Sequence, residues 1–332
     1  MKLNSNHNSN HNSKHNFKLN SKINLKLTEE SGQTSQPPWK LVDNSYYSLI
    51  KTDKTPILLK ISQQDINSLD VDWELPINYD GNINEIAIKK EVNRIFDLDF
   101  DLDKFYKYLH NNCELAPSLD FCKGLRLFIA RDPFECIISS ISSANNSIAR
   151  WTKSVNKISN IWGKTYKFSS GNFNDFPSPA ALKDVYEDNL IESAATSNEN
   201  IEGCISNLKY CGLGYRSSYI KKTSEVLTLE MDLSEISKMT YNEAFDTIIS
   251  LPGVGPKVAD CILLYGFNMG EAFPSDVWIK RIISYLYFDG KDITANKVRS
   301  FGMETFGEYA GYVQLYLFHY ARKSGLMDKL RK

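Results

Sequence analysis

Residues 240–267 read TYNEAFDTIISLPGVGPKVADCILLYGF, and this stretch decides the fold. Thr240 and Glu243 have the spacing of a capping box, which opens a helix. Pro256 is well placed as the first residue of a second helix, because that position needs no backbone N–H. The segment LPGVG at 251–255 lies between the two helices and carries two glycines. The sequence therefore predicts a helix-hairpin-helix, which is two helices joined by a short glycine turn.

The glycine turn of this hairpin suits an anion. Gly253 and Gly255 let backbone N–H groups come close to one, and the following helix adds its positive end. A DNA phosphate fits such a site, which touches only the backbone and so does not depend on base sequence. On the pattern alone, an ordinary turn in a helical bundle is an equally good interpretation.

Lys257, one position inside the second helix, favours a catalytic role over simple phosphate binding. The positive helix end and partial burial both disfavour the ammonium form, so we expect a pKa lowered toward roughly 7–8 and a nucleophilic amine. Asp276 follows nineteen residues later, at the start of the next predicted helix. It is expected to act with Lys257, to cap that helix, or to do both. A plain surface lysine near a phosphate is the alternative for Lys257.

The chain divides into three parts by composition. Residues 1–22 alternate Asn with Ser, His and Lys and are expected to form a disordered tail. Residues 23–90 are predicted to form a β-rich subdomain, in which 23–75 have the pattern of strands. Residues 91–332 are predicted to form a helical body, with the helix-hairpin-helix at 240–266. The predicted fold is mainly α with a small N-terminal antiparallel β subdomain (α+β).

Local signals support this division. Ile23, Leu25 and Leu27 alternate with polar residues, which indicates a strand. Asp132 followed by Pro133 is a strong helix start, with the aspartate as N-cap. The hydrophobic pattern changes from strand-like alternation to helical periodicity after the first quarter of the chain.

The composition is that of a globular protein and excludes several classes. The chain has 332 residues, 42% of them apolar and 24% charged, which suggests about two domains. Its apolar runs are far shorter than the roughly 18 residues that cross a bilayer, and the N-terminus has no signal-peptide stretch. We therefore expect neither a membrane protein nor a secreted one.

Cysteine spacing bears on metal sites, and charge bears on nucleic-acid binding. The six cysteines are scattered without a CxxC pair, which argues against a zinc ribbon or an iron–sulfur cluster and favours buried apolar positions. The net charge of −1 does not indicate a nucleic-acid binder. A basic stretch between residues 150 and 167 shows that a neutral total can hide a basic face.

Two runs carry a resemblance to a known family. LPGVGPKVADC at 251–261 and PSDVWIKR at 274–281 resemble the signature of the helix-hairpin-helix DNA glycosylases. Within that superfamily the chain most resembles the 8-oxoguanine DNA glycosylase/lyase family, from about residue 23 to residue 322. In that family the matching lysine attacks the sugar C1′, and the matching aspartate stabilises positive charge on the sugar and assists proton movement. The resemblance implies these roles for Lys257 and Asp276.

Two further motifs resemble the family's elements that fill the gap left by a flipped base. They are ANNSIAR at 144–150 and LGYR at 213–216. Tyr215 is implied to wedge into the base stack, where an aromatic ring can replace lost stacking. The residues implied to hydrogen-bond the orphaned cytosine are Asn145, Arg150 and Arg216. Without the resemblance, the asparagine is a turn residue and both arginines are surface charges.

Reading the damaged base requires an acceptor. Oxidised guanine differs from guanine by an oxo group at C8 and a hydrogen on N7, so discrimination needs an acceptor aimed at that N–H. A backbone carbonyl suits where a glycine lets the chain approach the ring edge. The segment Ser31-Gly32-Gln33 resembles the family segment whose glycine carbonyl has this role, so Gly32 is the candidate. On its own, Gly32 would be a turn residue.

The other lesion-binding residues follow from a C-terminal match. FGEYAGYVQ at 306–314 resembles the corresponding family segment. There Gln314 is implied to read the Watson–Crick edge of the base, while Phe318 and Cys261 are implied to sandwich its ring. By themselves, Phe318 and Cys261 would be interpreted as core residues.

The chain departs from the family pattern in two places. After Gln33 the family often has a Phe-Arg-Trp-like strand, whereas this chain has TSQPPW at 34–39. The proline pair is expected to reshape the wall behind Gly32. Trp278 stands where some members carry a phosphate-contacting histidine, so backbone binding is expected to differ there. Endonuclease III-like relatives usually carry a four-cysteine cluster after this region, and this sequence has none.

The resemblance implies a bifunctional base excision repair enzyme. It would flip 8-oxoguanine opposite cytosine out of duplex DNA, release the base through Lys257 and cut the strand by β-elimination. One alternative is a glycosylase for another oxidised base, either formamidopyrimidine or an oxidised pyrimidine. Another, from a different class, is a non-catalytic DNA-binding protein that uses the hairpin to hold phosphate. Such a protein would need neither Lys257 nor Asp276.

No cofactor is expected to be required for this activity. As in relatives, three backbone carbonyls of the hairpin are candidates to hold a structural K⁺ or Na⁺, those of Ile249, Leu251 and Val254. The expected partner is double-stranded DNA that contains oxidised guanine, and no membrane. The protein is expected to be an intracellular monomer acting on genomic DNA, in the cytoplasm or nucleoid, or in the nucleus if it is eukaryotic.

Overall fold

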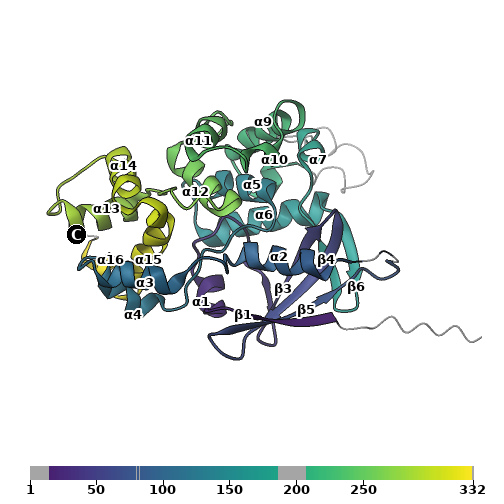
Figure 1. The fold of residues 1–332 in the computed structure, drawn as a ribbon. Helices are drawn as coiled ribbons and strands as arrows, with labels where there is room; N and C mark the ends of the chain where they lie inside the picture. Colours follow the sequence, from purple (N-terminus) through teal and green to yellow (C-terminus); the bar gives the residue numbers. More distant parts are fainter. Residues whose placement is uncertain (1–14, 80, 82, 186–206, 331–332) are drawn as a thin grey trace, which may run out of the picture.

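The structure is a computed structural model that describes residues 15–79, 81, 83–185 and 207–330. Its main sheet has five antiparallel strands in the order β1-β5-β4-β3-β2 (Figure 1). They are β1 (His15–Asn20), β2 (Lys40–Val42), β3 (Ser45–Thr52), β4 (Thr55–Ser62) and β5 (Ser68–Glu74). A separate antiparallel hairpin comes from the middle of the chain and consists of β6 (Thr165–Phe168) and β7 (Gly171–Asn174).

Two tight turns set the register of the sheet. Residues 43–44 join β2 to β3, and residues 53–54 join β3 to β4, with positive φ at all four positions. Positive φ at both central residues is typical of type I′ turns, whose twist matches that of the strands they connect.

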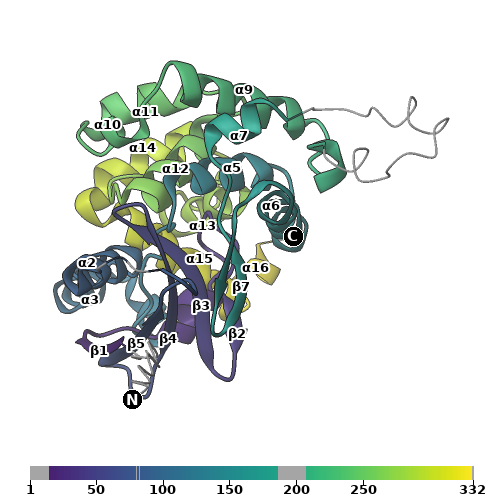
Figure 2. The same cartoon turned by 90° about the vertical axis from the view of Figure 1, so that its right-hand side faces the viewer.

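The two faces of the sheet are covered by different elements. Helix α2 (Glu85–Ile95) packs its buried apolar stripe on one face, where Ile57 and Leu59 belong to the same core. The β6–β7 hairpin lies against the other face, where Phe168 packs with Leu49 and Leu58 (Figure 2). Neighbouring strand residues point to opposite faces, so Ile57 and Leu58 belong to different cores.

The remaining helices form a body in two groups. Figure 1 shows α5 to α12 above the sheet and α13 to α16 at its side, together with α3 and α4. The helices are α3 (Leu102–His110), α4 (Leu119–Cys122), α5 (Pro133–Ser143), α6 (Ile148–Trp162), α7 (Pro179–Lys183), α9 (Arg216–Leu229), α10 (Leu233–Ile236), α11 (Tyr241–Ile249), α12 (Pro256–Phe267), α13 (Val277–Tyr287), α14 (Ala295–Phe306), α15 (Ala310–Lys323) and α16 (Leu326–Lys329). Short 3₁₀ turns lie at Ala116–Ser118, Lys209–Cys211 and Gly307–Tyr309.

The predicted helix starts are confirmed. The Asp132 side chain accepts a hydrogen bond from Glu135 N at 2.9 Å and caps α5. Thr240 and Glu243 form the complete capping box of α11. Helix α12 begins at Pro256, so the helix-hairpin-helix is present as predicted. The fold class is confirmed as well, since a mainly helical body joins a small N-terminal antiparallel sheet.

Three N-terminal predictions are wrong. Residues 15–20 of the expected disordered tail form β1, which pairs with β5 from His15↔Trp73 to Asn20↔Ser68, while residues 1–14 lie outside the described residues. The strand expected at Ile23, Leu25 and Leu27 is instead helix α1 (Leu25–Glu30). The subdomain boundary expected at residue 90 falls inside α2, which packs on the sheet as a whole.

The physical reasons for these errors are local. Polar residues of β1 satisfy their backbone groups by pairing with β5, so low hydrophobicity did not prevent a strand. The side chain of Asn24 accepts a hydrogen bond from Leu27 N at 2.9 Å, and this cap favours a helix over the strand that the alternation indicated.

A buried ion pair fastens the sheet to the helical body. Arg131 Nε and Nη2 each donate to the Glu135 carboxylate at 2.7 Å, and Nη1 donates to Ser48 Oγ of β3 at 2.8 Å. The paired geometry is the strong form of this contact. Gln36 accepts from Arg131 N at 3.3 Å and donates to Ile129 O at 3.1 Å. The segment after α1 is therefore held beside the start of α5.

The cysteines mostly follow the expectation of buried positions. Within the described ranges Cys122, Cys136, Cys211 and Cys261 are buried, Cys113 is exposed, and none forms a disulfide. Cys204 lies outside the described residues. None of the helices in the described part of the chain is both long and apolar enough to cross a membrane.

Candidate active site

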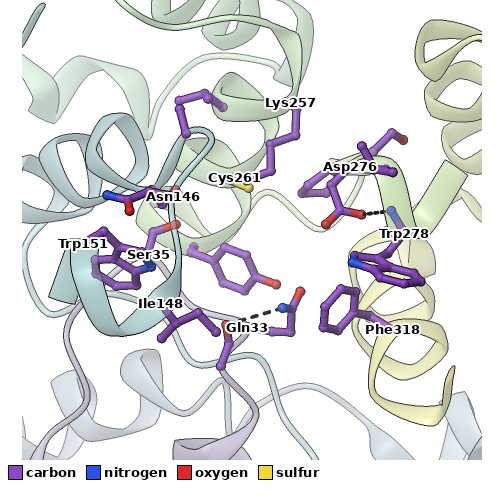
Figure 3. Close-up of a pocket in the computed structure, with 18 of the residues that line it drawn as sticks. Gln33, Ser35, Asn146, Ile148, Trp151, Lys257, Cys261, Asp276, Trp278 and Phe318 are labelled. Atoms are coloured by element: carbon purple, nitrogen blue, oxygen red, sulfur yellow. Dashed lines mark hydrogen bonds between the residues drawn. The ribbon is translucent and has the colours of Figure 1, made fainter. Parts of the chain in front are cut away.

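A cavity of about 680 Å³ opens where segments far apart in the sequence meet. Residues 32–35 after α1, the turn between α5 and α6, one face of α12, the start of α13 and one face of α15 line it (Figure 3). All six residues predicted to act on the sugar or hold the base are among its lining residues: Gly32, Lys257, Cys261, Asp276, Gln314 and Phe318. The structure therefore brings the predicted catalytic and base-binding residues to one place.

Lys257 enters the cavity from the first turn of α12. It is half-buried, and Cys261 lies one helical turn further along the same face. Figure 3 shows both side chains on the cavity side of this helix, opposite Asp276. A lysine in this position can reach a substrate atom that enters the cavity.

The expected lowering of the Lys257 pKa is wrong for the free protein. The pKa of Lys257 is raised above its ordinary value, chiefly by the sulfur of Cys261 and further by Asp276, while burial opposes the shift. The interactions with the Cys261 sulfur and the Asp276 carboxylate favour the ammonium form more than desolvation disfavours it. The neutral amine needed for nucleophilic attack is therefore a minor form of the free protein near neutral pH.

Asp276 is both the N-cap of α13 and a lining residue of the cavity. Its Oδ1 accepts hydrogen bonds from Trp278 N at 2.9 Å and from Ile279 N at 2.8 Å. These bonds fix the carboxylate at the positive end of the helix, where a negative charge is favoured. Both bonds use the same oxygen, so Oδ2 is left free of the cap to face positive charge in the cavity.

The two glycines of the hairpin turn differ in their surroundings: Gly253 packs closely against Tyr219, whereas Gly255 has open space beside it. Gly253 has φ +82°, and a Cβ there would lie 2.7 Å from the Cβ of Tyr219, which belongs to α9. Thr223, also on α9, donates to Pro252 O at 2.9 Å and holds the turn. A Cβ at Gly255 would meet no atom within 4 Å. The backbone at Gly255 is therefore accessible to an anion such as a phosphate.

The Gly32 loop is fixed by hydrogen bonds from two directions. Arg322 Nη1 on α15 donates to Ser31 O at 3.1 Å, and Gln33 N donates to Ser31 Oγ at 3.1 Å. Gly32 has φ +70°, and a Cβ there would lie 3.1 Å from Ile148 Cδ1. The positive φ favours glycine at this position.

The segment after Gln33, which departs from the family pattern, forms part of the cavity wall. Thr34 Oγ1 donates to Phe128 O at 2.9 Å, and the segment then runs on through Gln36 to the proline pair. These contacts hold Thr34 and Ser35 at the cavity surface. Trp278, the other departure, also lines the cavity, with the Arg281 guanidinium 5.2 Å from the centre of its ring.

The base-binding side of the cavity carries an unpaired acceptor. Gln314 and Phe318 lie one turn apart on α15, and Gln314 is only 3% exposed. Its Oε1 has no hydrogen bond to any described residue. A buried polar atom without a partner costs free energy, so such an atom in a cavity indicates a ligand that completes the bond.

The residues predicted to contact the orphaned base divide into two kinds. Asn145 is exposed on the turn between α5 and α6 with φ +50°, and Arg150 is exposed on α6. Tyr215 is 58% exposed. Arg216 is instead 8% exposed, and its Nε donates to Ala144 O at 2.9 Å while Nη2 donates to Asn145 O at 3.2 Å. In the free protein Arg216 therefore holds the turn that presents Asn145.

Sequence reasoning missed other lining residues, above all Tyr265. It lies on α12 at four and eight residues from Cys261 and Lys257, so helical spacing alone places it on the same face. Trp151 and Ser139 also line the cavity. No motif marks these two, since their place depends on how α5 and α6 cross.

Taken together, the fold and the cavity define a helix-hairpin-helix DNA glycosylase with a lysine in its cavity. The family model for the N-terminal domain of 8-oxoguanine DNA glycosylase matches residues 16–137. The model for the HhH-GPD superfamily of base excision DNA repair proteins matches residues 138–308. The chain belongs to the 8-oxoguanine DNA glycosylase family of this superfamily.

Individual relatives agree with this assignment. The chain is 42% identical over 308 residues to the probable N-glycosylase/DNA lyase of Methanothermobacter thermautotrophicus, which covers 92% of this chain and 96% of that protein. It is 32% identical over 216 residues to the N-glycosylase/DNA lyase OGG1 of Arabidopsis thaliana, which covers 62% of this chain and 53% of that protein.

A solved structure shares the fold over nearly the whole chain. It is the Clostridium acetobutylicum 8-oxoguanine glycosylase/lyase in complex with double-stranded DNA containing cytosine opposite 8-oxoguanine. The TM-score is 0.73 at 30% identity, over 92% of this chain and 93% of the other. The chain is accordingly an enzyme of base excision repair, a DNA N-glycosylase and lyase.

Proposed function

We propose that the protein removes 8-oxoguanine paired with cytosine from duplex DNA and then cuts the strand at the resulting site. One observation carries this proposal. A single cavity brings Lys257 and Asp276 together with the Gly32 loop and the unpaired acceptor of Gln314, although these residues come from four separate segments. The first pair suits chemistry at a sugar, and the second suits recognition of a base edge.

In the first half of the proposed reaction, the base leaves. The neutral amine of Lys257 attacks C1′, the bond from C1′ to the base breaks, and a proton lost from Nζ neutralises the departing base. The Asp276 carboxylate, fixed by its cap bonds, stabilises the positive charge that develops on the sugar. Preorganisation matters here because the carboxylate needs no rearrangement when that charge appears.

In the second half, the strand is cut. The sugar ring opens at its C1′–O4′ bond and the ring oxygen takes up a proton, which leaves a Schiff base between Nζ and C1′. Loss of a proton from C2′ then breaks the C3′–O3′ bond, and the downstream strand leaves with this phosphate as its 5′ end. Water hydrolyses the Schiff base and restores Lys257.

The DNA is proposed to be double-stranded and bound by one copy of the protein. Flipping a base out of the stack costs a few kcal/mol, which contacts in the cavity and around the orphaned base offset. Exposed Asn145 and Tyr215 suit that second role. The open backbone at Gly255 suits a phosphate of the same duplex.

A monovalent cation at the hairpin is part of the same proposal. Carbonyl oxygens are suitable ligands for such an ion. The Leu251 carbonyl accepts a hydrogen bond from Val254 N at 3.1 Å, which leaves its second lone pair available. Together with the carbonyls of Ile249 and Val254, it would hold K⁺ or Na⁺ and stiffen the turn that binds phosphate.

Borohydride trapping on a panel of lesions tests the proposed function. Borohydride reduces a Schiff base to a stable amine, so each duplex that is processed becomes linked to the protein. We expect trapping on duplexes containing 8-oxoguanine opposite cytosine to exceed trapping on those containing formamidopyrimidine or an oxidised pyrimidine. Preferential trapping on either of the latter would assign the enzyme to another oxidised base.

The contrast between the two arginines predicts different effects on opposite-base preference. Arg150→Ala removes an exposed donor that is free to reach cytosine, so the preference for cytosine over adenine opposite 8-oxoguanine should shrink by ~1–3 kcal/mol, which is roughly 5- to 150-fold. Single-turnover excision rates with each opposite base measure this ratio.

Lys153→Ala is the matched control for Arg150→Ala, because it removes another exposed cation from α6 one turn away. A residue that contacts only phosphate should lower both rates equally and leave the ratio intact. Arg216→Ala should shrink the preference too, but through the loss of its bonds to the turn at Asn145. An Arg150→Ala variant that behaves like the Lys153→Ala control would make Arg150 a phosphate or surface residue.

A further inference from the structure

The Tyr265 hydroxyl is a polar group that the reaction described above does not use. Tyr265 is only 3% exposed and lines the cavity. Its hydroxyl has no hydrogen bond to any residue in the described ranges. By contrast, the buried hydroxyls of Tyr312 and Tyr316 donate to Asp97 Oδ2 at 2.8 Å and to Leu125 O at 2.9 Å. Of these three tyrosines, the one that lines the cavity is the one whose hydroxyl has no partner. The hydroxyl of Tyr287 also has no hydrogen bond to a described residue, but Tyr287 is not among the residues that line the cavity.

Leaving this hydroxyl unpaired is costly for the free protein. A buried hydroxyl without a partner destabilises a fold by ~1–3 kcal/mol, whereas phenylalanine would fill the same space at no such cost. The pKa of Tyr265 is raised well above its usual value by burial, so the hydroxyl keeps its proton and remains a hydrogen-bond donor. A donor that is held ready inside a cavity suits a ligand that carries an acceptor.

The position of Tyr265 along α12 indicates which part of a ligand it meets. It follows Lys257 by eight residues, which is about 12 Å along a helix axis. Lys257 must reach the sugar, so Tyr265, two turns further along the helix, is placed to meet another part of the nucleotide, and the flipped base is that part. Gln314 Oε1, in the same cavity, is an acceptor without a partner. The cavity therefore offers a ligand one unpaired donor, from Tyr265, and one unpaired acceptor, from Gln314.

We propose that the Tyr265 hydroxyl donates a hydrogen bond to a ring carbonyl oxygen of the flipped base. This is a third polar contact to the base, beside the Gly32 carbonyl and the Gln314 side chain, and it makes Tyr265 a specificity-determining residue. The inference rests on the proposed function, because 8-oxoguanine carries two such oxygens, at C6 and C8. An abasic site carries neither, so it offers Tyr265 nothing to bind.

Tyr265→Phe tests this inference because it removes only the hydroxyl. Single-turnover rates are measured on two duplexes, one with 8-oxoguanine opposite cytosine and one with an abasic site. We expect base excision to fall about tenfold, which corresponds to the loss of one hydrogen bond, and cleavage at the abasic site to be unchanged. The unfolding temperature should not fall, since no bond within the protein is lost.

Tyr287→Phe is the matched control. Tyr287 packs its ring against Phe301 and Phe306 and is not among the residues that line the cavity. Removing its hydroxyl should leave both rates unchanged. Binding is measured independently of chemistry in a Lys257→Gln background, where Tyr265→Phe should weaken binding to the 8-oxoguanine duplex but not to a duplex carrying a stable abasic analogue.

The outcomes separate the inference from the proposed function. If the unaltered enzyme excises 8-oxoguanine and Tyr265→Phe does so equally fast, the inference fails and the proposed function stands. If Tyr265→Phe slows both reactions by the same factor, the hydroxyl acts on the sugar or on Lys257, which also overturns the inference. If the unaltered enzyme cuts abasic DNA but leaves 8-oxoguanine in place, the proposed function fails and the inference fails with it.

Discussion

Lys257→Gln should abolish borohydride trapping on 8-oxoguanine DNA and lower base excision by on the order of 10³-fold or more, because the variant lacks the attacking amine. Lesion binding should persist, since glutamine fills similar space and the base-binding residues are untouched. Trapping is measured by electrophoresis of the covalent complex, and binding by titration of labelled duplex. The separation of binding from chemistry is the signature of a nucleophile.

Lys280→Gln is the matched control for this prediction. Lys280 is a second lysine of the same cavity, and its Nζ lies 2.7 Å from Asp292 Oδ1 in an ion pair. Its ammonium group is already paired, so its loss should leave trapping intact. Trapping that survives in Lys257→Gln and disappears in Lys280→Gln would move the nucleophile to residue 280.

Gly32→Ala should lose excision of 8-oxoguanine by roughly 10²-fold or more while keeping cleavage at an abasic site. Alanine disfavours the positive φ of Gly32, and its methyl group would lie 3.1 Å from Ile148 Cδ1, so we expect the loop whose carbonyl is proposed to read N7–H to shift. The abasic site has no base to read, and Lys257 is untouched. Single-turnover rates on both duplexes measure the contrast.

Backbone strain is controlled with a second glycine. Gly32 has φ +70°, and alanine in this region costs ~1–2 kcal/mol of stability. Gly325 has φ +78° and open space around its missing Cβ, so Gly325→Ala carries the same strain away from the cavity. It should lower the unfolding temperature similarly and leave excision unchanged. Full excision by Gly32→Ala would mean that another group reads the lesion and would reopen the substrate assignment.

The sequence by itself determined the elements that depend on short-range chemistry. Capping residues such as Asp132 and Thr240 and the proline at 256 define helix starts within three or four residues, so the helix-hairpin-helix and its lysine could be predicted. The same local rule failed at Leu25, because hydrophobic alternation over a few residues does not distinguish a strand from a short capped helix.

The resemblance to a family predicted site residues that local sequence rules do not identify. Gly32, Gln314 and Phe318 have no short-range feature that marks them as base-binding, and only the match to a family placed them together. The structure confirms that they share one cavity. In the segment that leads to the proline pair, Thr34 and Ser35 lie at the cavity surface next to Gly32.

Only the tertiary structure decided the pKa values of the site and which of its polar groups have hydrogen-bond partners. The sequence indicated a lowered pKa for Lys257, but Cys261 and Asp276 raise it, since the balance of burial against neighbouring charge depends on distances in space. Arg216 has the sequence position of a base-contacting residue, yet its guanidinium is bonded to the turn at Asn145.

The unpaired hydroxyl of Tyr265 shows the same limit most directly. Its helical spacing from Lys257 can be read from the chain, but whether its hydroxyl finds a partner depends on every segment packed around α12. Helix caps and turns are set by bonds between neighbours in the sequence. Hydrogen-bond satisfaction and pKa values inside a cavity are set by groups that folding brings together from hundreds of residues apart, as it brings Arg322 to Ser31.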